Sequence, residues 1–184
     1  MNYYFYSVGI SIMFNKKRKY DNKKLTWLRA GKEFAIFILS AFVVFRFIIG
    51  VSWISGNSMY PTFPNKQPVI YNRLSKSYSR GDIVTFHTPS SDEYIIKRVV
   101  AVGGDVVDLH DGTLWINGEA EADFASYSIE SWATSPEDGS VVYPLTLKPG
   151  QFFAVGDNRS VSIDSRSYGP VSFSQIRGKL FIAG

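Results

Sequence analysis

The sequence predicts a mostly β domain that follows one apolar segment long enough to form a membrane helix. Residues 34–54 are almost wholly apolar, and about 20 such residues span a bilayer as a helix. Farther along, short stretches rich in β-branched and aromatic residues are bounded by Gly, Pro, Asp and Asn, which is typical of strands and turns. A length of 184 residues allows one substantial core but not two large domains. The expected strands are 68–74, 82–88, 94–102, 105–109, 113–118, 151–156 and 176–183.

The first 33 residues are strongly basic. They carry eight of the 20 Lys and Arg residues but only two of the 16 Asp and Glu residues, so residues 34–184 are slightly acidic. A nucleic-acid-binding protein would carry its basic residues as a stripe on a folded face. Here the run KKRKYDNKK precedes an apolar segment, which fits anionic lipid headgroups better. We therefore interpret residues 1–33 as a cytoplasmic segment next to the lipid bilayer and expect no nucleic-acid partner.

The apolar segment 34–54 is interpreted as a transmembrane helix, although it contains one charged residue, Arg46. An arginine within a bilayer is costly, but its long stem can reach the outer interface, where Trp53 would also be favourable. A buried core helix is the alternative, whereas the apolar part of a cleaved signal peptide would be only ~7–15 residues long. Because Lys and Arg stay inside, we expect a single pass through the cytoplasmic membrane, with the N-terminus inside and everything after Gly50 outside.

Residues 55–184 are expected to form an extracytoplasmic, β-rich domain. The stretch HDGTLWINGE contains an Asp-Gly and an Asn-Gly pair, which is a strong hairpin signal. Residues 119–147 are polar and weakly patterned, and we interpret them as an excursion from the sheet. The absence of cysteine excludes disulfides and thiolate chemistry. The two histidines show no metal-ligand spacing, so we expect neither a metal nor an organic cofactor.

A serine follows the apolar segment in the turn SGNSMYPTF, residues 55–63. Ser58 could cap the turn, fill it, or act as a nucleophile, and a nucleophile needs a group that accepts its proton. His87 and His110 stand at strand ends or turns, where solvent-exposed histidines are the simpler interpretation. The base must then be another residue type.

Lys97 is the candidate base. In YIIKRVV, strand alternation places Ile95, Lys97 and Val99 on one face. Apolar neighbours desolvate an ammonium group and lower its pKa, and only the neutral amine can accept a proton. From the residue type alone, a lysine that extends into solvent from a strand edge is the commoner alternative, so the assignment needs support from another segment.

That support is the polar segment GDNRSVSIDSRSYGPV, residues 156–171. It could be an ordinary polar loop. Asp164 and Arg166, however, are spaced so that they could form a local ion pair that holds the loop. Ser162 would then be free to form a hydrogen bond with Lys97 and orient its flexible side chain.

Together, SGNSMYPT, RGDIVTF, YIIKRVVAVGGD and GDNRSVSIDSRSYG resemble, in order and setting, the boxes of type I signal peptidases. These are membrane-anchored Ser/Lys proteases, and the resemblance, to their Gram-positive-like branch, covers roughly residues 30–184. It implies the family's β-rich catalytic core, with Ser58 as nucleophile and Lys97 as general base. The supporting residues would be Ser162, which positions the lysine, and the ion pair of Asp164 and Arg166.

Two positions depart from the pattern of many family members. Gly56 stands where a serine often helps to bind the oxyanion, so the oxyanion hole would depend mainly on the Ser58 backbone N–H. Gly103 stands where a proline is usual, which should affect only the rigidity of a turn. Neither departure removes the serine or the lysine.

The resemblance implies that the protein cleaves signal peptides from exported preproteins at the outer face of the membrane, near the secretion translocon. Signal peptides end in a small-x-small pattern, which calls for shallow apolar pockets and no cofactor. Candidate pocket walls are Ile54, Met59, Phe63, Ile95 and Ile96.

Two alternatives belong to other functional classes. A self-cleaving repressor or mutagenesis protein would share the Ser/Lys pair and the β core, but would need a DNA-binding or soluble partner region in place of the apolar segment. A catalytically idle or specialised relative could serve as a scaffold or processing factor in surface-fibre assembly. That interpretation would gain weight if Ser58 or Lys97 were missing, and both are present.

Overall fold

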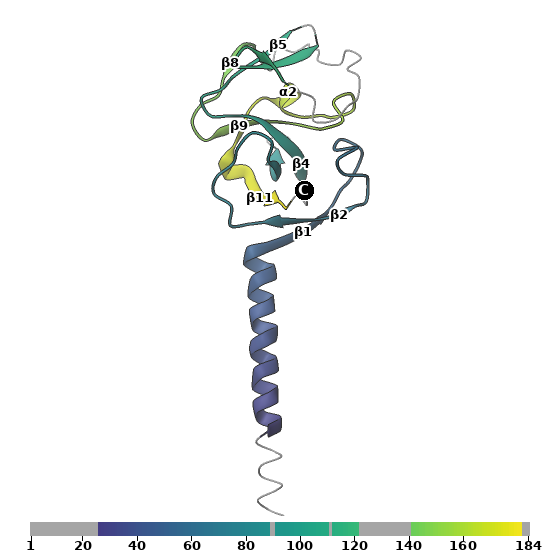
Figure 1. Cartoon of the computed structure of the whole chain (residues 1–184), viewed down its shortest axis with the longest axis vertical. Coiled ribbons are helices and arrows are strands. Elements are labelled where there is room, and N and C mark those ends of the chain that lie inside the picture. Colours follow the sequence, from purple (N-terminus) through teal and green to yellow (C-terminus); the bar gives the residue numbers. More distant parts are fainter. Residues whose placement is uncertain (1–25, 89–90, 111, 122–140, 182–184) are drawn as a thin grey trace, which may run out of the picture. The chain divides into compact units, whose positions relative to one another are not determined.

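The structure is a computed structural model, and it describes residues 26–88, 91–110, 112–121 and 141–181. The chain divides into two compact units, one ending at Arg46 and the other beginning at Phe47. The main element of the first unit is a helix over residues 26–43 (Figure 1). The basic run KKRKYDNKK lies outside the described residues. In the part of the chain that the structure describes, no helix is both long enough and apolar enough to cross a membrane.

The helix expected over residues 34–54 is shorter than predicted. The α-helix ends at residue 43, the π-helix η1 (Val44–Ile48) follows, and Ile49–Trp53 form strand β1 instead. β1 pairs antiparallel with β2 (Pro68–Asn72) along its whole length. An apolar run can form either a helix or a buried strand, and hydropathy alone does not separate the two. The β domain therefore begins before residue 55, its expected boundary.

The described residues of the second unit form two antiparallel sheets. The larger has seven strands in the order β1-β2-β11-β3-β4-β9-β10, and the smaller has four in the order β7-β6-β5-β8. The remaining strands are β3 (Ile83–Thr88), β4 (Ser91–Val102), β5 (Val106–His110), β6 (Thr113–Ile116), β7 (Glu119–Ala120), β8 (Leu145–Thr146), β9 (Gln151–Val155), β10 (Val171–Ser172) and β11 (Ile176–Leu180). Among the described residues of this unit there are also two short helices, α2 (Ser165–Tyr168) and the 3-10 helix η2 (Phe173–Gln175).

The mostly β character predicted from the sequence is confirmed, and all seven expected strands are present. The Asn117–Gly118 pair forms the expected tight turn between β6 and β7, with positive φ at both residues (56° and 84°). The expected excursion over residues 119–147 is wrong at both ends, where β7 and β8 form part of the smaller sheet. Residues 122–140, its middle part, lie outside the described residues.

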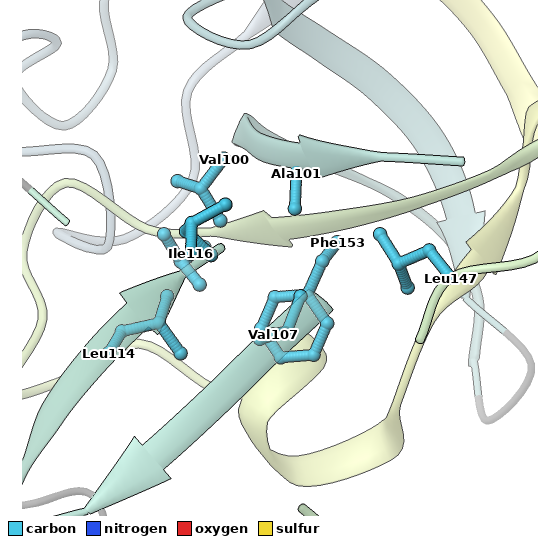
Figure 2. Close-up of a cluster of buried hydrophobic side chains, with 8 residues drawn as sticks. Val100, Ala101, Val107, Leu114, Ile116, Leu147 and Phe153 are labelled. Atoms are coloured by element: carbon cyan, nitrogen blue, oxygen red, sulfur yellow. The ribbon is translucent and has the colours of Figure 1, made fainter. Parts of the chain in front are cut away.

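A buried apolar cluster joins the two sheets (Figure 2). It contains Phe153 from β9 and Val107 from β5, both with no exposed surface. Its other members are Val100, Ala101, Leu114, Ile116, Leu147 and Val155. Burying a side chain of this size contributes about 1.5–3 kcal/mol, so this cluster fixes the smaller sheet against β4 and β9.

Strand β4 is the longest strand and lies between β3 and β9 in the larger sheet. Apolar clusters cover both faces of the region that it forms with β3: Ile83 belongs to one cluster and its neighbour Val84 to another. A side chain in the middle of this strand is therefore surrounded by protein. Lys97, which pairs with Val84, occupies such a position.

Candidate active site

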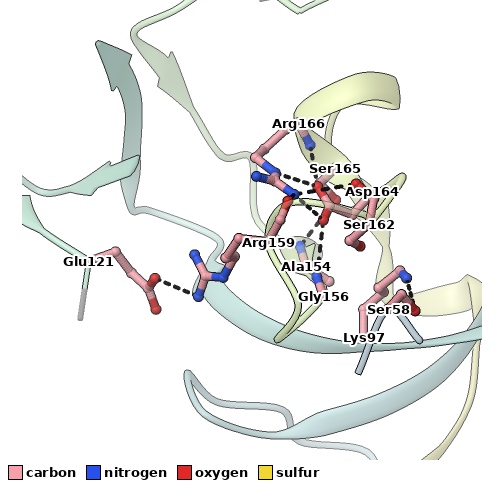
Figure 3. Close-up of polar contacts among 10 residues, drawn as sticks. All are labelled: Ser58, Lys97, Glu121, Ala154, Gly156, Arg159, Ser162, Asp164, Ser165 and Arg166. Carbon is pink, nitrogen blue, oxygen red and sulfur yellow. Dashed lines mark hydrogen bonds and ion pairs between the residues drawn. The ribbon is translucent and has the colours of Figure 1, made fainter. Parts of the chain in front are cut away.

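A serine hydroxyl and a lysine amine meet in the second unit. Lys97 Nζ donates a hydrogen bond of 2.7 Å to Ser58 Oγ, as Figure 3 shows. The two residues are 39 positions apart in the chain. Ser58 lies in the segment between β1 and β2, and Lys97 lies in β4, so the pair forms only in the folded sheet.

The turn that carries Ser58 is held by its neighbours. Met59, 1% exposed, and Phe63, 9% exposed, are buried in the same cluster, and the Phe63 N–H donates to the Met59 carbonyl at 2.8 Å. Gly56 has a φ of +85°, a conformation that residues with a Cβ rarely adopt. Backbone geometry thus gives a reason for glycine at this position.

Burial makes Lys97 an unusual lysine. Lys97 is only 4% exposed, and this burial lowers the pKa of its side-chain amine from 10.5 to about 8. The carboxylates of Asp164 and Asp157 raise the pKa, and Arg166 lowers it, but none of these effects outweighs burial. With a pKa of about 8, about one lysine in ten is neutral at pH 7, against fewer than about one in a thousand for an ordinary lysine. A neutral amine this close to a hydroxyl can accept its proton.

A polar loop between β9 and α2 lies beside the pair. Asp164 has no exposed surface, and its carboxylate accepts two hydrogen bonds from the Arg166 guanidinium, at 2.8 and 2.9 Å. The same carboxylate accepts from the Gly156 N–H at 3.0 Å and from the Arg166 N–H as the N-cap of α2. The ion pair expected from the sequence therefore ties both ends of the loop together.

Ser162 differs from its expected arrangement. Its Oγ is buried and has no hydrogen-bond partner among the described residues, so the expected bond to Lys97 is not formed. Ser162 nevertheless stands against Gly156, where a Cβ would overlap the Ser162 Oγ and would lie 2.5 Å from the Ser58 carbonyl oxygen. Gly156 is thus the contact between the loop and the serine turn, a role that the sequence did not reveal.

A second buried ion pair was also missed. Asp157, whose side chain has no exposed surface, accepts hydrogen bonds from Arg98 Nε at 2.8 Å and Arg98 Nη2 at 2.7 Å. It also accepts one from Thr62 Oγ1 at 2.5 Å. Arg98 is next to Lys97 and Thr62 is four residues after Ser58. The Asp157 carboxylate therefore connects strand β4, which carries Lys97, and the turn that carries Ser58 to the loop between β9 and α2.

The five candidate pocket residues do not form one group. Ile54, Met59 and Phe63 belong to a buried core cluster, against which the half-buried Ile96 packs. Ile95, also half-buried, packs against a different cluster. Sequence proximity to the serine and lysine did not distinguish side chains that fill the core from side chains that can also face a ligand.

Neither histidine is part of this arrangement. The His87 ring packs against the Tyr94 ring at a centroid distance of 4.7 Å. The His110 ring stacks on Trp115 at 4.8 Å, with Nδ1 3.5 Å from the Asp108 carboxylate. These contacts give both histidines a structural explanation.

The chain is similar to known peptidases over most of its length. Residues 27–183 match the family model described as signal peptidase, peptidase S26. Signal peptidase IB of Staphylococcus aureus is 30% identical over 159 residues, covering 79% of this chain and 83% of that protein. Signal peptidase I T of Bacillus subtilis is 30% identical over 158 residues, covering 83% and 82%. A crystal structure of a signal peptidase I from Enterococcus faecalis aligns with a TM-score of 0.47 and 30% identity, covering 58% of this chain and 98% of that one.

These matches identify the chain as a serine endopeptidase, and its described part has a mostly β fold. The chain belongs to the signal peptidase family, peptidase S26, and is of the type I, Gram-positive-like kind. The resemblance seen in the sequence motifs is thereby confirmed.

Proposed function

We propose that this protein removes signal peptides from exported preproteins, with Ser58 as nucleophile and Lys97 as general base. One observation carries the proposal: a lysine that is 4% exposed donates a 2.7 Å hydrogen bond to a serine hydroxyl. An exposed lysine would remain an ammonium ion at neutral pH and could not act as a base. Family membership supplies the reaction class, and this contact supports the assignment of the reacting groups.

The chemistry proceeds in two halves. Lys97 Nζ takes the Ser58 proton as Oγ attacks the scissile carbonyl carbon, and the resulting ammonium gives that proton to the departing amine. The C–N bond breaks, the mature protein leaves, and the signal peptide remains as an ester of Ser58. Lys97 then takes a proton from water, the resulting hydroxide attacks the ester, and Ser58 recovers its proton as the signal peptide departs as an acid.

The surrounding residues would hold this geometry. The Ser58 backbone N–H would stabilise the oxyanion, since no side chain is available at Gly56. The Asp164–Arg166 pair keeps the loop closed on Gly156, and the Ser162 hydroxyl, buried and unpaired among the described residues, would be a partner for Lys97 once the proton moves. An unpaired buried hydroxyl is costly, which favours such a contact during the reaction.

The substrate would bind beside β4. We propose that the half-buried Ile95 and Ile96, which immediately precede Lys97 and retain exposed surface, contact the small side chains of a small-x-small site from opposite faces of β4. Ile54, Met59 and Phe63 would support Ile96, which packs against their cluster. Larger substrate side chains would then be excluded, because the well-packed core behind this surface cannot move to make room for them.

We further propose that the protein is anchored by its N-terminal helix and works at the outer face of the cytoplasmic membrane, near the translocon. The apolar part of the helical stretch, residues 34–48, is about 22 Å long at ~1.5 Å per residue. That is shorter than the ~30 Å hydrocarbon core, a mismatch that bilayer thinning and snorkelling by Arg46 would accommodate. On the β1–β2 ribbon, Val51, Trp53 and Ile70 are more than half exposed, which fits a sheet edge close to lipid.

The proposal is tested by incubating the detergent-solubilised full chain with a preprotein and sequencing the new N-terminus of the product. Cleavage directly after the small-x-small site by the wild-type protein, and none by Ser58→Ala, is expected. Equal cleavage by both proteins would refute Ser58 as nucleophile. A wild-type protein that binds preprotein without cutting it would instead favour a scaffold role.

A further inference from the structure

A third ion pair connects the loop beside Lys97 to the smaller sheet. Arg159 Nη2 donates to Glu121 Oε2 at 2.8 Å, and the two side chains are 12% and 3% exposed. Glu121 directly follows β7, and its own N–H donates to the Leu114 carbonyl in β6 at 2.8 Å. The carboxylate is therefore fixed to the smaller sheet, and the guanidinium belongs to the loop between β9 and α2 (Figure 3).

Hydrogen bonds continue from this pair toward the active site. The backbone carbonyl of Arg159 accepts from Arg166 Nη2 at 2.8 Å, and Arg166 is the partner of Asp164. The Asp164 carboxylate accepts from the Gly156 N–H at 3.0 Å. Gly156 packs against both Ser162 and the Ser58 carbonyl oxygen. A continuous series of contacts thus leads from Glu121 to the turn of the nucleophile.

The tip of the loop has little apolar support. Val161 and Ile163 are 59% and 75% exposed, and Ser160 is exposed as well. Segments with few buried apolar contacts open at a low free-energy cost. Polar anchors therefore determine the position of the loop, and the Glu121–Arg159 pair joins the loop to a different sheet.

We propose that Glu121, acting through Arg159, is a positioning residue that holds the loop of residues 156–166 against Ser58 and Lys97. This inference rests on the proposed function of that pair. Glu121 does not touch the reacting atoms. Its effect is to tie the loop to the smaller sheet, so that the loop continues to exclude water from the lysine.

The expected consequence follows from the surroundings of Lys97. The charged groups that act on it from the loop are Asp157, Asp164 and Arg166, and Arg98 is its neighbour on β4. Burial is the largest influence and lowers the pKa of Lys97. A loosened loop would admit water, so the pKa would rise toward 10.5 and a smaller fraction of the lysine would be neutral at pH 7.

The test compares Glu121→Gln, Arg159→Gln and the charge-exchanged double variant Glu121→Arg/Arg159→Glu in the full chain. For the single variants we expect kcat to fall about tenfold with little change in KM, because positioning losses act on the chemical step. The acid limb of kcat should move upward by several tenths of a pH unit to about one unit. The double variant should recover much of both effects, since the opposite charges face each other again.

A readout that does not depend on activity separates this inference from the proposed function. The titration of Lys97 is followed by NMR of the full chain in micelles with labelled lysine side chains, assigned by Lys97→Arg. An upward shift of the Lys97 pKa in Glu121→Gln, reversed in the double variant, supports the inference even if no preprotein is cut, in which case the proposed function alone fails.

The matched control is Lys179→Met, which removes the 2.7 Å ion pair between Lys179 and Asp82. Neither of these two residues contributes to the pKa shift of Lys97. The control should lower the unfolding temperature slightly and leave both titration and kcat unchanged. If Glu121→Gln behaves like this control, its ion pair is only structural and the inference is overturned. A pKa shift that the double variant does not reverse would also overturn it, because Glu121 would then not act through Arg159.

Discussion

Thr62 Oγ1 donates a 2.5 Å hydrogen bond to Asp157 Oδ2 across 95 residues of sequence. The bond joins the turn that carries Ser58 to the loop that begins with Gly156. Arg98, adjacent to Lys97, pairs with the same carboxylate. A buried carboxylate thus connects the segments that carry Ser58 and Lys97 without a hydrogen bond to either side chain.

Removing the Thr62 hydroxyl should therefore affect both stability and rate. In Thr62→Val, the buried carboxylate of Asp157 loses one partner, and hydrogen bonds to charged groups contribute about 1.5–3 kcal/mol. We expect a lower free energy of unfolding in denaturant titrations and a lower kcat for preprotein cleavage. Thr62→Ser keeps the hydroxyl and is the matched control. If the valine variant cleaves as fast as the serine variant, the bond has no part in positioning Ser58.

Gly156→Ala should reduce activity strongly. The added methyl group would overlap the Ser162 hydroxyl and approach the Ser58 carbonyl to 2.5 Å, so the loop and the serine turn must separate. Displacing reacting groups by about 1 Å can cost roughly a hundredfold in rate. Kinetics of cleavage and an unfolding curve measure the two effects separately. Gly104→Ala is a control, because its Cβ meets nothing within 4 Å, although its φ of +99° will cost some stability. Normal kcat in Gly156→Ala would show that the close contact is not needed.

Lys97→Met should be inactive yet more stable than the wild type near neutral pH. Burial lowers the pKa of Lys97 from 10.5 to about 8, so below pH 8 the folded state holds a buried charge that the unfolded state exposes to water. Below pH 8, burying this charge lowers the free energy of unfolding by its full amount. The loss declines as pH rises from about 8 to 10.5, because the unfolded state then binds more protons than the folded state. At about 1.4 kcal/mol per pH unit, the gain is of order 3 kcal/mol. Denaturant titrations of both proteins at pH 7 and 10 measure this gain in stability. A gain that is larger at pH 10 than at pH 7 would contradict a lowered pKa for Lys97.

The proposed orientation can be tested on whole cells. Basic residues before the apolar segment predict that the region after Gly50 lies outside the membrane. Protease added to intact spheroplasts should degrade that region, while a cytoplasmic marker remains protected. Complete protection of the region after Gly50, with degradation only after lysis, would reverse the proposed topology.

Local patterns were sufficient to predict much of this molecule. Stretches rich in β-branched and aromatic residues, bounded by turn residues, identified the expected strands, and the spacing of Asp164 and Arg166 indicated their ion pair, because those residues are two positions apart. The motif order also indicated the meeting of Ser58 and Lys97, although they are 39 positions apart.

Long-range polar contacts could not be predicted in the same way. The partners in Arg98–Asp157, Thr62–Asp157 and Arg159–Glu121 are 59, 95 and 38 positions apart, and no periodicity in one sequence reports such pairs. Strand β1 was missed for a different reason. It continues an apolar helix without a break in composition, so only its pairing with β2 reveals it.

The most direct test of the central claim is the pH dependence of kcat/KM for preprotein cleavage, whose acid limb reports the pKa of the essential base in the free enzyme. If Lys97 is that base, the limb should lie near pH 8, where burial places its pKa. It should remain there in His87→Ala and His110→Ala. An acid limb near pH ~6.5, the ordinary range of histidine, that disappears when either histidine is replaced would contradict Lys97 as the base.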